Sequence, residues 1–279
     1  METGRASRTA FRVAMRRAAH QLVDHPPVLH DPIAVLLLGL RLQVDAVRET
    51  DPVSRAFRAF MAARSRLAED YLAGAVAAGV GQYVVLGAGL DTFAYRNPHR
   101  HLRVFEVDFP ATQEYKRALL ADAGIVAPRN LTFVPLDFER KTLAEGLSEG
   151  GLDARLPAFF GWLGVAPYLS LEACRATLST IGQMQPGSGV CFDYALAPEI
   201  LSPTRRAAHE ALAARVAAAG EPFRTFFTPE ALNSDLSDAG FTRIEQVDSE
   251  QLNALYFPDR ADGLRLPPEG LGMMAAAWV

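Results

Sequence analysis

The sequence predicts an α/β fold with a mostly parallel, seven-stranded sheet covered by helices on both faces. From about residue 83, short apolar runs alternate with helical stretches, which is the pattern of parallel strands joined by crossover helices. The first apolar run passes straight into a turn with two glycines, Gly87-Ala88-Gly89. The last run, residues 273–279, is expected to close the sheet as an antiparallel strand.

The apolar runs give the expected strands, at residues 83–86, 104–107, 131–136, 159–165, 190–194, 241–247 and 273–279. A helix is expected to begin at Thr228-Pro229, because threonine caps a helix N-terminus and proline fits its first turn. Residues 248–270 are rich in Pro, Asp and Gly, so we expect a loop over the functional edge of the sheet.

The N-terminal region is expected to form a helical cap over residues 1–80, in front of a sheet-bearing core over residues 81–279. Apolar side chains recur there at helical spacing, at Phe11, Met15, Ala18 and Leu22. One face of this first helix must therefore be buried, and we expect it to lie across the ligand cleft. A second helix is expected over residues 53–78.

Bulk composition restricts the class of protein. The 279 residues carry a net charge of −4, which argues against a general nucleic-acid partner. The two cysteines, Cys174 and Cys191, are too few for a disulfide framework, so a reducing cytoplasm is expected. The apolar run 33–40 is too short to span a bilayer. Since no residue cluster has metal-ligand spacing, we expect metal-independent chemistry.

The glycine turn has two interpretations. In a nucleotide-binding corner, Gly87 would let the chain turn off a buried strand, and Gly89 would leave room for a ligand against the main chain. The alternative is a plain strand-to-helix turn. A dinucleotide fingerprint would need a third glycine where this chain has Thr92, so a dinucleotide is disfavoured.

The second helix carries an arginine within its apolar stripe. At 100° per residue, Arg64 lies on the same face as Phe60 and Ala68. A buried guanidinium needs an anion, because it cannot release its proton. That anion is either an Asp or Glu of the core or a ligand carboxylate; a third alternative is that Arg64 extends to solvent at the end of the stripe.

Acids follow the next two strands. Asp108 ends the second strand about 20 residues beyond the glycine turn, where a carboxylate can accept hydrogen bonds from ribose hydroxyls. Glu106 is either a second such acid or a buried acid held by backbone amides. Asp137 and Phe138 end the third strand and offer partners for an exocyclic amine and a base, although Asp137 could instead cap a helix. Together with Arg64, these residues predict a nucleoside that carries an amino acid, S-adenosyl-L-methionine.

The same residues lie in motifs that resemble the leucine carboxyl methyltransferase family. The motifs are Asp31-Pro32-Ile33-Ala34, Ala63-Arg64-Ser65-Arg66, the string from Gly87 to Arg96, and Phe105-Glu106-Val107-Asp108-Phe109-Pro110. The resemblance runs from about residue 9 to residue 194 and is strongest to bacterial members that act on polyketides and other natural products, such as tetracenomycin precursors.

The resemblance implies a class I Rossmann-like methyltransferase fold and a role for each matching residue. Arg64 would hold the methionyl carboxylate, the Gly87-Ala88-Gly89 turn would contact the cofactor, Asp108 would bind the ribose, and Asp137 with Phe138 would frame the adenine. The chain departs from the family where many members have a Glu shortly before a Tyr on the fourth strand, because the stretch from Trp162 to Tyr168 has no acid.

Tyr168 and Tyr194 are the catalytic candidates, because each follows a strand at the edge where ligands of such sheets bind. Each could instead be an aromatic wall of the pocket. Arg17 is a candidate partner for a substrate carboxylate, with a surface charge as the alternative. His20 is a candidate substrate contact, with a structural imidazole as the alternative.

The function expected from these residues is O-methylation of a small secondary metabolite. A carboxylate acceptor comes first by resemblance, and a hydroxyl acceptor would need a base. One alternative is a cofactor-binding protein that catalyses a cyclising or pericyclic step or has no turnover; a less favoured one is an NAD-dependent oxidoreductase. Neither a nucleic acid nor a membrane is expected as partner, and the chain is expected to be a monomer or a homodimer.

Overall fold

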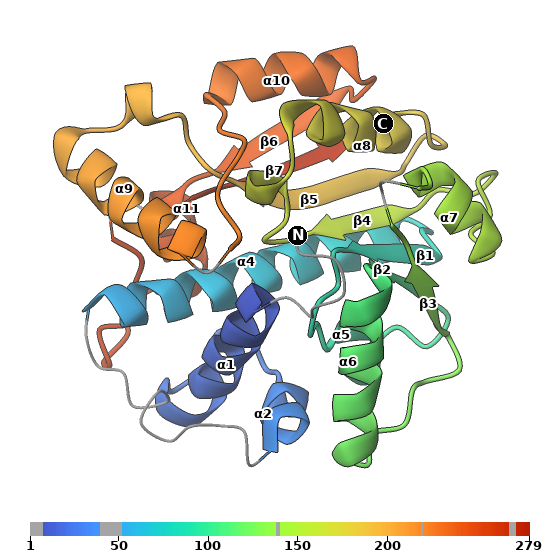
Figure 1. The fold of residues 1–279 in the computed structure, drawn as a ribbon, viewed down its shortest axis with the longest axis horizontal. Helices are drawn as coiled ribbons and strands as arrows, with labels where there is room; N and C mark the ends of the chain where they lie inside the picture. The colour runs from blue at the N-terminus through green and yellow to red at the C-terminus, as the bar shows by residue number, and fades with distance from the viewer. Residues whose placement is uncertain (1–7, 40–51, 138–139, 219, 268–271) are drawn as a thin grey trace.

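The structure, a computed structural model, describes residues 8–39, 52–137, 140–218, 220–267 and 272–279 (Figure 1). Its sheet has seven strands in the order β3-β2-β1-β4-β5-β7-β6. Their bounds are β1 Gln82–Leu86, β2 Arg103–Asp108, β3 Leu131–Pro135, β4 Phe159–Trp162, β5 Gly189–Tyr194, β6 Arg243–Val247 and β7 Met273–Trp278. The described helices are α1 Arg8–Val23, α2 Pro32–Leu38, α4 Pro52–Ala77, α5 Phe93–Arg96, α6 Pro110–Asp122, α7 Leu143–Glu149, α8 Leu171–Gly182, α9 Pro203–Ala218, α10 Pro229–Asp238 and α11 Ser249–Tyr256, with short 3₁₀ turns η2 Ala166–Tyr168 and η3 Pro198–Ile200.

The strand pairing confirms the predicted mostly parallel sheet. β1 pairs in parallel with β2 on one side and with β4 on the other, and β4 pairs in parallel with β5. β7 is antiparallel to both β5 and β6. The strand order therefore reverses between β1 and β4, and sheets of this kind bind ligands at the carboxyl ends of the strands beside that point.

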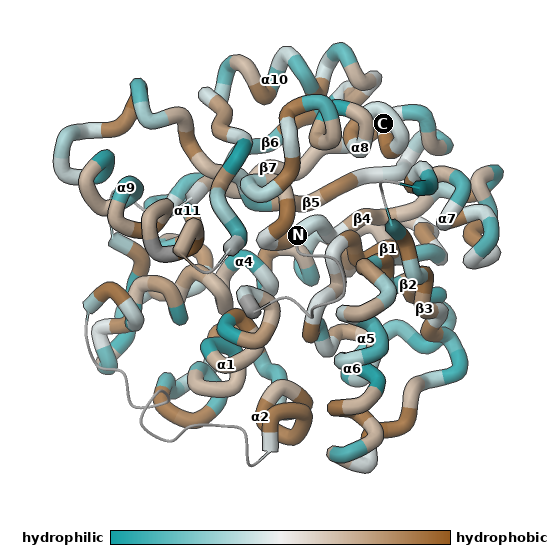
Figure 2. The backbone as a smooth tube through the Cα atoms, in the orientation of Figure 1, coloured by the Kyte–Doolittle hydropathy of each residue, from teal (hydrophilic) through white to brown (hydrophobic). Residues whose placement is uncertain are grey.

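Helices cover both faces of the sheet, as the alternating pattern predicts. Side chains from α4 and α11 pack with one set of strand residues, and side chains from α7, α8 and α10 pack with the other set. In Figure 1, α8 and α10 lie above the sheet, with α4 and α6 below it. Figure 2 shows the hydrophobic colours along the central strands, whereas the outer helices alternate between polar and apolar residues.

The N-terminal helices form a third layer. Apolar residues of α1 and α2 pack with Leu90 and with α6, which places these helices beside the glycine turn. α4 itself packs on the sheet, as one of its two covering layers. A division of the chain at residue 80 stays a prediction. Among the described helices, none is long and apolar enough to cross a membrane.

Two segments of the C-terminal half differ from the expectation. The expected loop 248–270 contains the helix α11, which begins at a capping box of Asp248 and Gln251 and buries Leu252. β4 ends at Trp162, three residues earlier than expected, because Gly164 turns the chain with a φ of 71°. The helix at Thr228 is confirmed, since the Thr228 side chain accepts a hydrogen bond from the Ala231 amide.

Candidate functional site

The glycine turn lies between β1 and α5 and needs both of its glycines. Gly87 and Gly89 have φ values of 63° and 49°, in the left-handed region that other residues avoid. A Cβ on Gly87 would lie 2.3 Å from the Cγ2 atom of Val165, and one on Gly89 would lie 3.1 Å from the Cβ of Ala10 in α1. The turn is therefore enclosed by the segment after β4 on one side and by the N-terminal helix on the other. Ala88 is buried within it and donates its amide to the Val107 carbonyl.

Asp108 joins the end of β2 to this turn. One carboxylate oxygen accepts a hydrogen bond from the Gly89 amide at 2.5 Å, and the other accepts one from the Phe109 amide at 2.7 Å. Burial raises the pKa of Asp108, although these two amides act in the opposite direction. Each oxygen keeps a lone pair for a further donor, as a ribose-binding acid would require.

Arg64 forms a buried ion pair with Asp193. Its Nη1 atom lies 2.9 Å from Oδ2 of Asp193, and the two side chains are 7% and 9% exposed. The other carboxylate oxygen accepts a hydrogen bond from the Gly164 amide at 2.5 Å. The Nε atom of Arg64 is buried and has no hydrogen-bond partner among the described residues. The anion that Arg64 needs is thus supplied in part by the core, and donors of the guanidinium remain for a ligand.

The alternation of β5 explains why Asp193 faces Arg64. Cys191 packs in the cluster that contains α4, whereas Phe192 and Tyr194 pack in the cluster on the opposite face. Because successive strand side chains point to opposite faces, Asp193 lies on the α4 side. The sequence-based search missed Asp193; the pattern that could have found it is a charged residue within the apolar run 190–194.

Tyr168 lies close to the Arg64 and Asp193 pair. Burial raises the pKa of its hydroxyl to about 12, and the charges of Arg64 and Asp193 act on it in opposite directions. Its ring contacts Phe223 at 5.3 Å between centroids. Among the described residues, none forms a hydrogen bond with the Tyr168 hydroxyl, so this group is available to a ligand.

Tyr194 does not join this group. Its side chain is buried in the core on the other face of the sheet, and its hydroxyl donates a hydrogen bond to the Gln246 side chain. Its ring also packs on Phe227 at 6.2 Å between centroids. Tyr194 therefore links β5 to Gln246 of β6 and to Phe227, which precedes α10.

Of the two residues expected on the adenine side, Asp137 and Phe138, the structure describes only Asp137. The Asp137 side chain is 25% exposed and lies 3.6 Å from Nε of Arg140, and its carbonyl oxygen accepts hydrogen bonds from the amides of residues 140 and 141. Phe138 lies outside the described residues. Asp137 thus lies two residues beyond the end of β3, with a side chain that is partly exposed to solvent.

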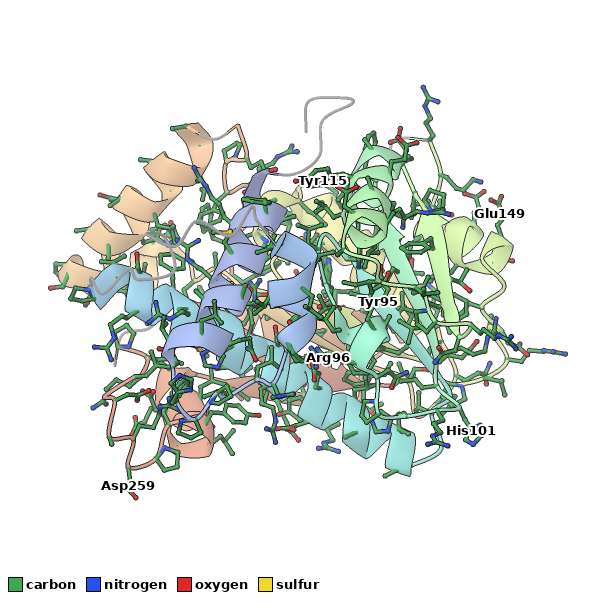
Figure 3. The ribbon with its side chains drawn as sticks, turned by 90° about the horizontal axis from the view of Figure 1, so that it is seen from below. Tyr95, Arg96, His101, Tyr115, Glu149 and Asp259 are labelled. Carbon is green, nitrogen blue, oxygen red and sulfur yellow. The ribbon has the colours of Figure 1, made fainter. Side chains whose placement is uncertain are left out.

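Arg17 is buried, so the alternative of a surface charge is wrong. Its Nε and Nη2 atoms donate to Oδ2 of Asp31 at 3.0 and 2.6 Å, and Nη2 also donates to the Thr92 hydroxyl at 2.6 Å. Arg96 lies 3.4 Å from the other Asp31 oxygen and is paired with Glu69 of α4. Figure 3 labels Arg96 where α5 meets the N-terminal helices. We call these five residues the cap network: Arg17, Asp31, Glu69, Thr92 and Arg96. Their contacts join the N-terminal helices to the end of the glycine turn.

His20 is also enclosed within the N-terminal layer. Its Nε2 atom accepts a hydrogen bond from the Val28 amide at 2.8 Å, and its Nδ1 atom lies 2.9 Å from a carboxylate oxygen of Asp24. Arg58 of α4 holds the same carboxylate with two hydrogen bonds. Both ring nitrogens of His20 thus have structural partners, which matches the structural alternative.

Glu106 is a buried acid held by a lysine, which neither sequence-based alternative included. Lys116 of α6 lies 2.5 Å from Oε2 of Glu106, and both side chains are 1% exposed. Burial raises the pKa of Glu106 to about 7, although Lys116 acts in the opposite direction. No group of three or more His, Cys, Asp or Glu residues is placed to hold a metal ion within the ranges that the structure describes.

Comparison with known proteins identifies the family. The model of the leucine carboxyl methyltransferase family matches residues 10–182. The chain belongs to this family. Relatives of the chain include YktD of Bacillus subtilis, whose name assigns it to the S-adenosyl-L-methionine-dependent methyltransferases; it is 31% identical over 293 residues, covering 95% of each chain. A Mycobacteroides abscessus protein named for the same activity is 36% identical over 200 residues, covering 68% of this chain and 64% of its own.

Solved structures agree on the fold. A methyltransferase from Thermobifida fusca superposes with a TM-score of 0.56 at 21% identity, covering 94% of this chain and 93% of its own. A DUF574 family protein from Streptomyces avermitilis superposes with a TM-score of 0.55 at 17% identity, covering 94% and 96%. This leucine carboxyl methyltransferase family member is therefore an S-adenosyl-L-methionine-dependent methyltransferase of Rossmann-like fold. The NAD-dependent alternative is excluded.

The residues of the site fit such a cofactor. The buried Nε atom of Arg64, which has no hydrogen-bond partner in the described part of the chain, can donate to a carboxylate, and Asp108 has lone pairs beside the glycine turn for ribose hydroxyls. When bound, S-adenosyl-L-methionine supplies an electrophilic methyl group. The protein contributes alignment of the reacting atoms and exclusion of water, because methyl transfer is an in-line displacement.

Proposed function

We propose that this methyltransferase acts on an oxygen of a small natural product, with a carboxylate as the first choice of acceptor and a hydroxyl as the second. The observation that carries the proposal is the Tyr168 hydroxyl, which has no hydrogen-bond partner among the described residues and whose pKa is affected by the charges of Arg64 and Asp193. A phenol in that position can donate a hydrogen bond to an acceptor oxygen and orient it.

The cofactor side of the site comprises Arg64, the Gly87-Ala88-Gly89 turn and Asp108, with Asp137 and Phe138 toward the adenine. Arg64 would hold the methionyl carboxylate through its free donors, and Asp108 would hold the ribose. The support for this arrangement is that the turn, Asp108 and Arg64 all lie at the carboxyl ends of β1, β2, β4 and β5, beside the reversal of strand order.

The acceptor side is aromatic. The rings of Tyr168, Phe223, His209 and Phe226 contact one another in sequence, with centroid distances of 5.3, 6.1 and 5.2 Å. The Thr225 hydroxyl and the Arg224 amide fix this segment to the chain around Tyr168, by hydrogen bonds of 2.6 and 2.7 Å to backbone carbonyls. Such a wall favours a planar aromatic acceptor of the polyketide type.

A carboxylate acceptor suits the chemistry of these side chains. A carboxylate is already ionised at neutral pH and needs no base, whereas a hydroxyl must lose its proton. Burial raises the pKa of Tyr168 to about 12, so its hydroxyl stays protonated near neutral pH and cannot act as the base. His209 is the histidine of the aromatic wall, and burial lowers its pKa, which favours the neutral imidazole. A neutral imidazole is the form that can accept a proton from a hydroxyl acceptor.

Calorimetry tests the cofactor assignment. Arg64→Ala should weaken S-adenosyl-L-methionine binding about 10- to 100-fold, or by about 1.5–3 kcal/mol, because a hydrogen-bonded charge is lost. Arg66→Ala is the matched control, since Arg66 lies on the same helix with its side chain 48% exposed. Equal affinity of Arg64→Ala and wild type would refute the assignment of the methionyl carboxylate to Arg64.

Product chemistry tests the acceptor. The enzyme is incubated with S-adenosyl-L-methionine and a panel of aromatic acids and phenols, and S-adenosylhomocysteine is measured together with the methylated product. A methyl ester is cleaved by mild alkali and a methyl ether is not, so the product reports whether a carboxylate or a hydroxyl was used. A cyclised product without S-adenosylhomocysteine would instead support the alternative of a step other than methylation. A monomer or homodimer is the proposed assembly, and light scattering measures it.

A further inference from the structure

The Arg64 and Asp193 pair is neutral as a unit, which restricts the ligand that it can accept. Both side chains are buried, and each carries one full charge. A phosphate or a simple carboxylate that approached Arg64 would also meet the charge of Asp193. A ligand group with both an anionic and a cationic end would match both charges and would compensate each of them.

We propose that Asp193 binds the α-ammonium group of the cofactor's methionyl part, so that Arg64 and Asp193 together form a clamp for an α-amino acid. This rests on the proposed function, in that Arg64 is taken to hold the methionyl carboxylate. Asp193 uses one oxygen for Nη1 of Arg64 and the other for the Gly164 amide, so each oxygen can accept a further hydrogen bond. Arg64 keeps its Nε atom for the carboxylate.

The clamp also accounts for the absence of an acid after β4. The stretch from Trp162 to Tyr168 contains none, but β5 pairs with β4 in parallel, with Phe192 opposite Trp162. Asp193 therefore follows immediately beyond the paired region, and its hydrogen bond to the Gly164 amide places a carboxylate beside the chain that leaves β4. The negative charge that is missing after β4 is thus supplied by Asp193 of β5.

Gly164 permits this arrangement. Its φ is 71°, and a Cβ there would lie 2.9 and 3.0 Å from the two terminal nitrogens of Arg64. A larger residue would push the guanidinium away from Asp193. Residue 164 thus lets the guanidinium lie directly against the backbone that Asp193 also contacts.

Calorimetry with two ligands tests the clamp without any turnover. One ligand is S-adenosylhomocysteine, and the other is its deamino analogue, in which hydrogen replaces the amino group. Wild type should bind the deamino analogue about 10- to 100-fold more weakly, as expected when a charge-assisted hydrogen bond is lost. Asp193→Asn should weaken S-adenosylhomocysteine binding by a similar factor and change binding of the deamino analogue less than about threefold. Circular dichroism confirms that the variant is folded.

Two outcomes would overturn the proposal. The first is equal affinity of wild type for the two ligands, which needs no variant and holds even if Asp193→Asn fails to fold. The second is an equal loss of affinity for both ligands in Asp193→Asn, which would make Asp193 only a positioning residue for Arg64. Failure of the cofactor assignment itself is seen separately, as unchanged binding of both ligands in Arg64→Ala.

Discussion

Arg17 and Asp31 meet in a buried contact in which one carboxylate oxygen accepts hydrogen bonds from two guanidinium nitrogens, at 3.0 and 2.6 Å. The other carboxylate oxygen, Oδ1, caps α2 by accepting a hydrogen bond from the Ala34 amide, and it also accepts one from the Thr92 hydroxyl at 2.6 Å. One acid therefore links α1, α2 and the end of the glycine turn. The family motif residues around positions 31 and 92 are in this way parts of one buried network.

Asp31→Asn should strongly destabilise the fold. The substitution leaves Arg17 buried without its counter-charge, and breaking a buried pair in this way typically costs about 3–5 kcal/mol. Urea unfolding followed by circular dichroism measures the loss. Glu149→Gln is the matched control, because its exposed pair with Lys141 should contribute no more than about 1 kcal/mol. A loss below 1 kcal/mol for Asp31→Asn would contradict the role of the cap network.

The same acid predicts a pH dependence. Burial alone would raise the pKa of Asp31, but the charges of Arg17 and Arg96 bring it below the ordinary value. The stabilisation is therefore fully present above the unfolded-state pKa, near 4, and is lost as pH falls through the lower folded-state value. Wild type should lose more free energy of unfolding than Asp31→Asn between about pH 5 and pH 2. Parallel profiles for the two proteins would argue against this linkage.

The buried Glu106 and Lys116 pair should behave as one unit. Glu106→Gln and Lys116→Met each leave one buried partner unpaired, so each should cost about 3–5 kcal/mol, and the double variant should cost less than the sum. Since burial raises the pKa of Glu106 to about 7, its contribution to stability is greatest below its unfolded-state pKa and declines as pH rises toward 7. Urea unfolding at several pH values measures both effects. Additive losses in the double variant would show that the two side chains are not coupled.

The two glycines of the turn should differ in their tolerance of alanine. Gly87→Ala combines the left-handed backbone with a contact of 2.3 Å to Val165, whereas Gly89→Ala meets Ala10 at 3.1 Å. We expect a loss of about 1–2 kcal/mol for Gly89→Ala and a greater one for Gly87→Ala. Adding Val165→Ala to Gly87→Ala should recover part of the loss. Thermal unfolding ranks the variants, and the reverse order would disprove the described packing.

Substitution of the two tyrosine candidates should have different effects, one mainly on stability and the other mainly on activity. Tyr194→Phe removes a hydrogen bond to Gln246 and should cost about 1 kcal/mol of stability with little effect on turnover. Tyr168→Phe should leave stability unchanged and lower kcat/KM for the acceptor up to about tenfold. Unfolding curves and steady-state kinetics on both variants check this. A drop in turnover for Tyr194→Phe alone would reverse the assignment.

Much of the fold could be predicted because it is encoded locally. Strand β1 and its turn are visible as an apolar run that ends in Gly87 and Gly89, and the helix at Thr228 is visible as a cap followed by proline. The contact of Asp108 with the Gly89 amide follows from adjacent parallel strands that end at the same edge of the sheet. These features depend on spacing along the chain, which the sequence displays directly.

The parts that could not be predicted depend on contacts between distant positions. Arg64 and Asp193 are 129 positions apart, and only the packing of α4 against β5 brings them together. Burial of Arg17 likewise depends on partners at positions 31 and 92, so a charged residue on a helix gave no local indication of its surroundings. The helix α11 was missed because its glycine- and proline-rich flank dominates the composition of residues 248–270.

The place of β7 in the sheet has a consequence for the order of folding. β7 is last in the chain, yet it lies between β5 and β6 and bonds to both. Until residues 273–278 have been synthesised, the backbone groups of β5 and β6 that they will pair with have no strand partner, and such open edges invite pairing between chains. The sheet is continuous only once that strand has paired with both neighbours, and chain association during refolding is expected to depend on how quickly it does so.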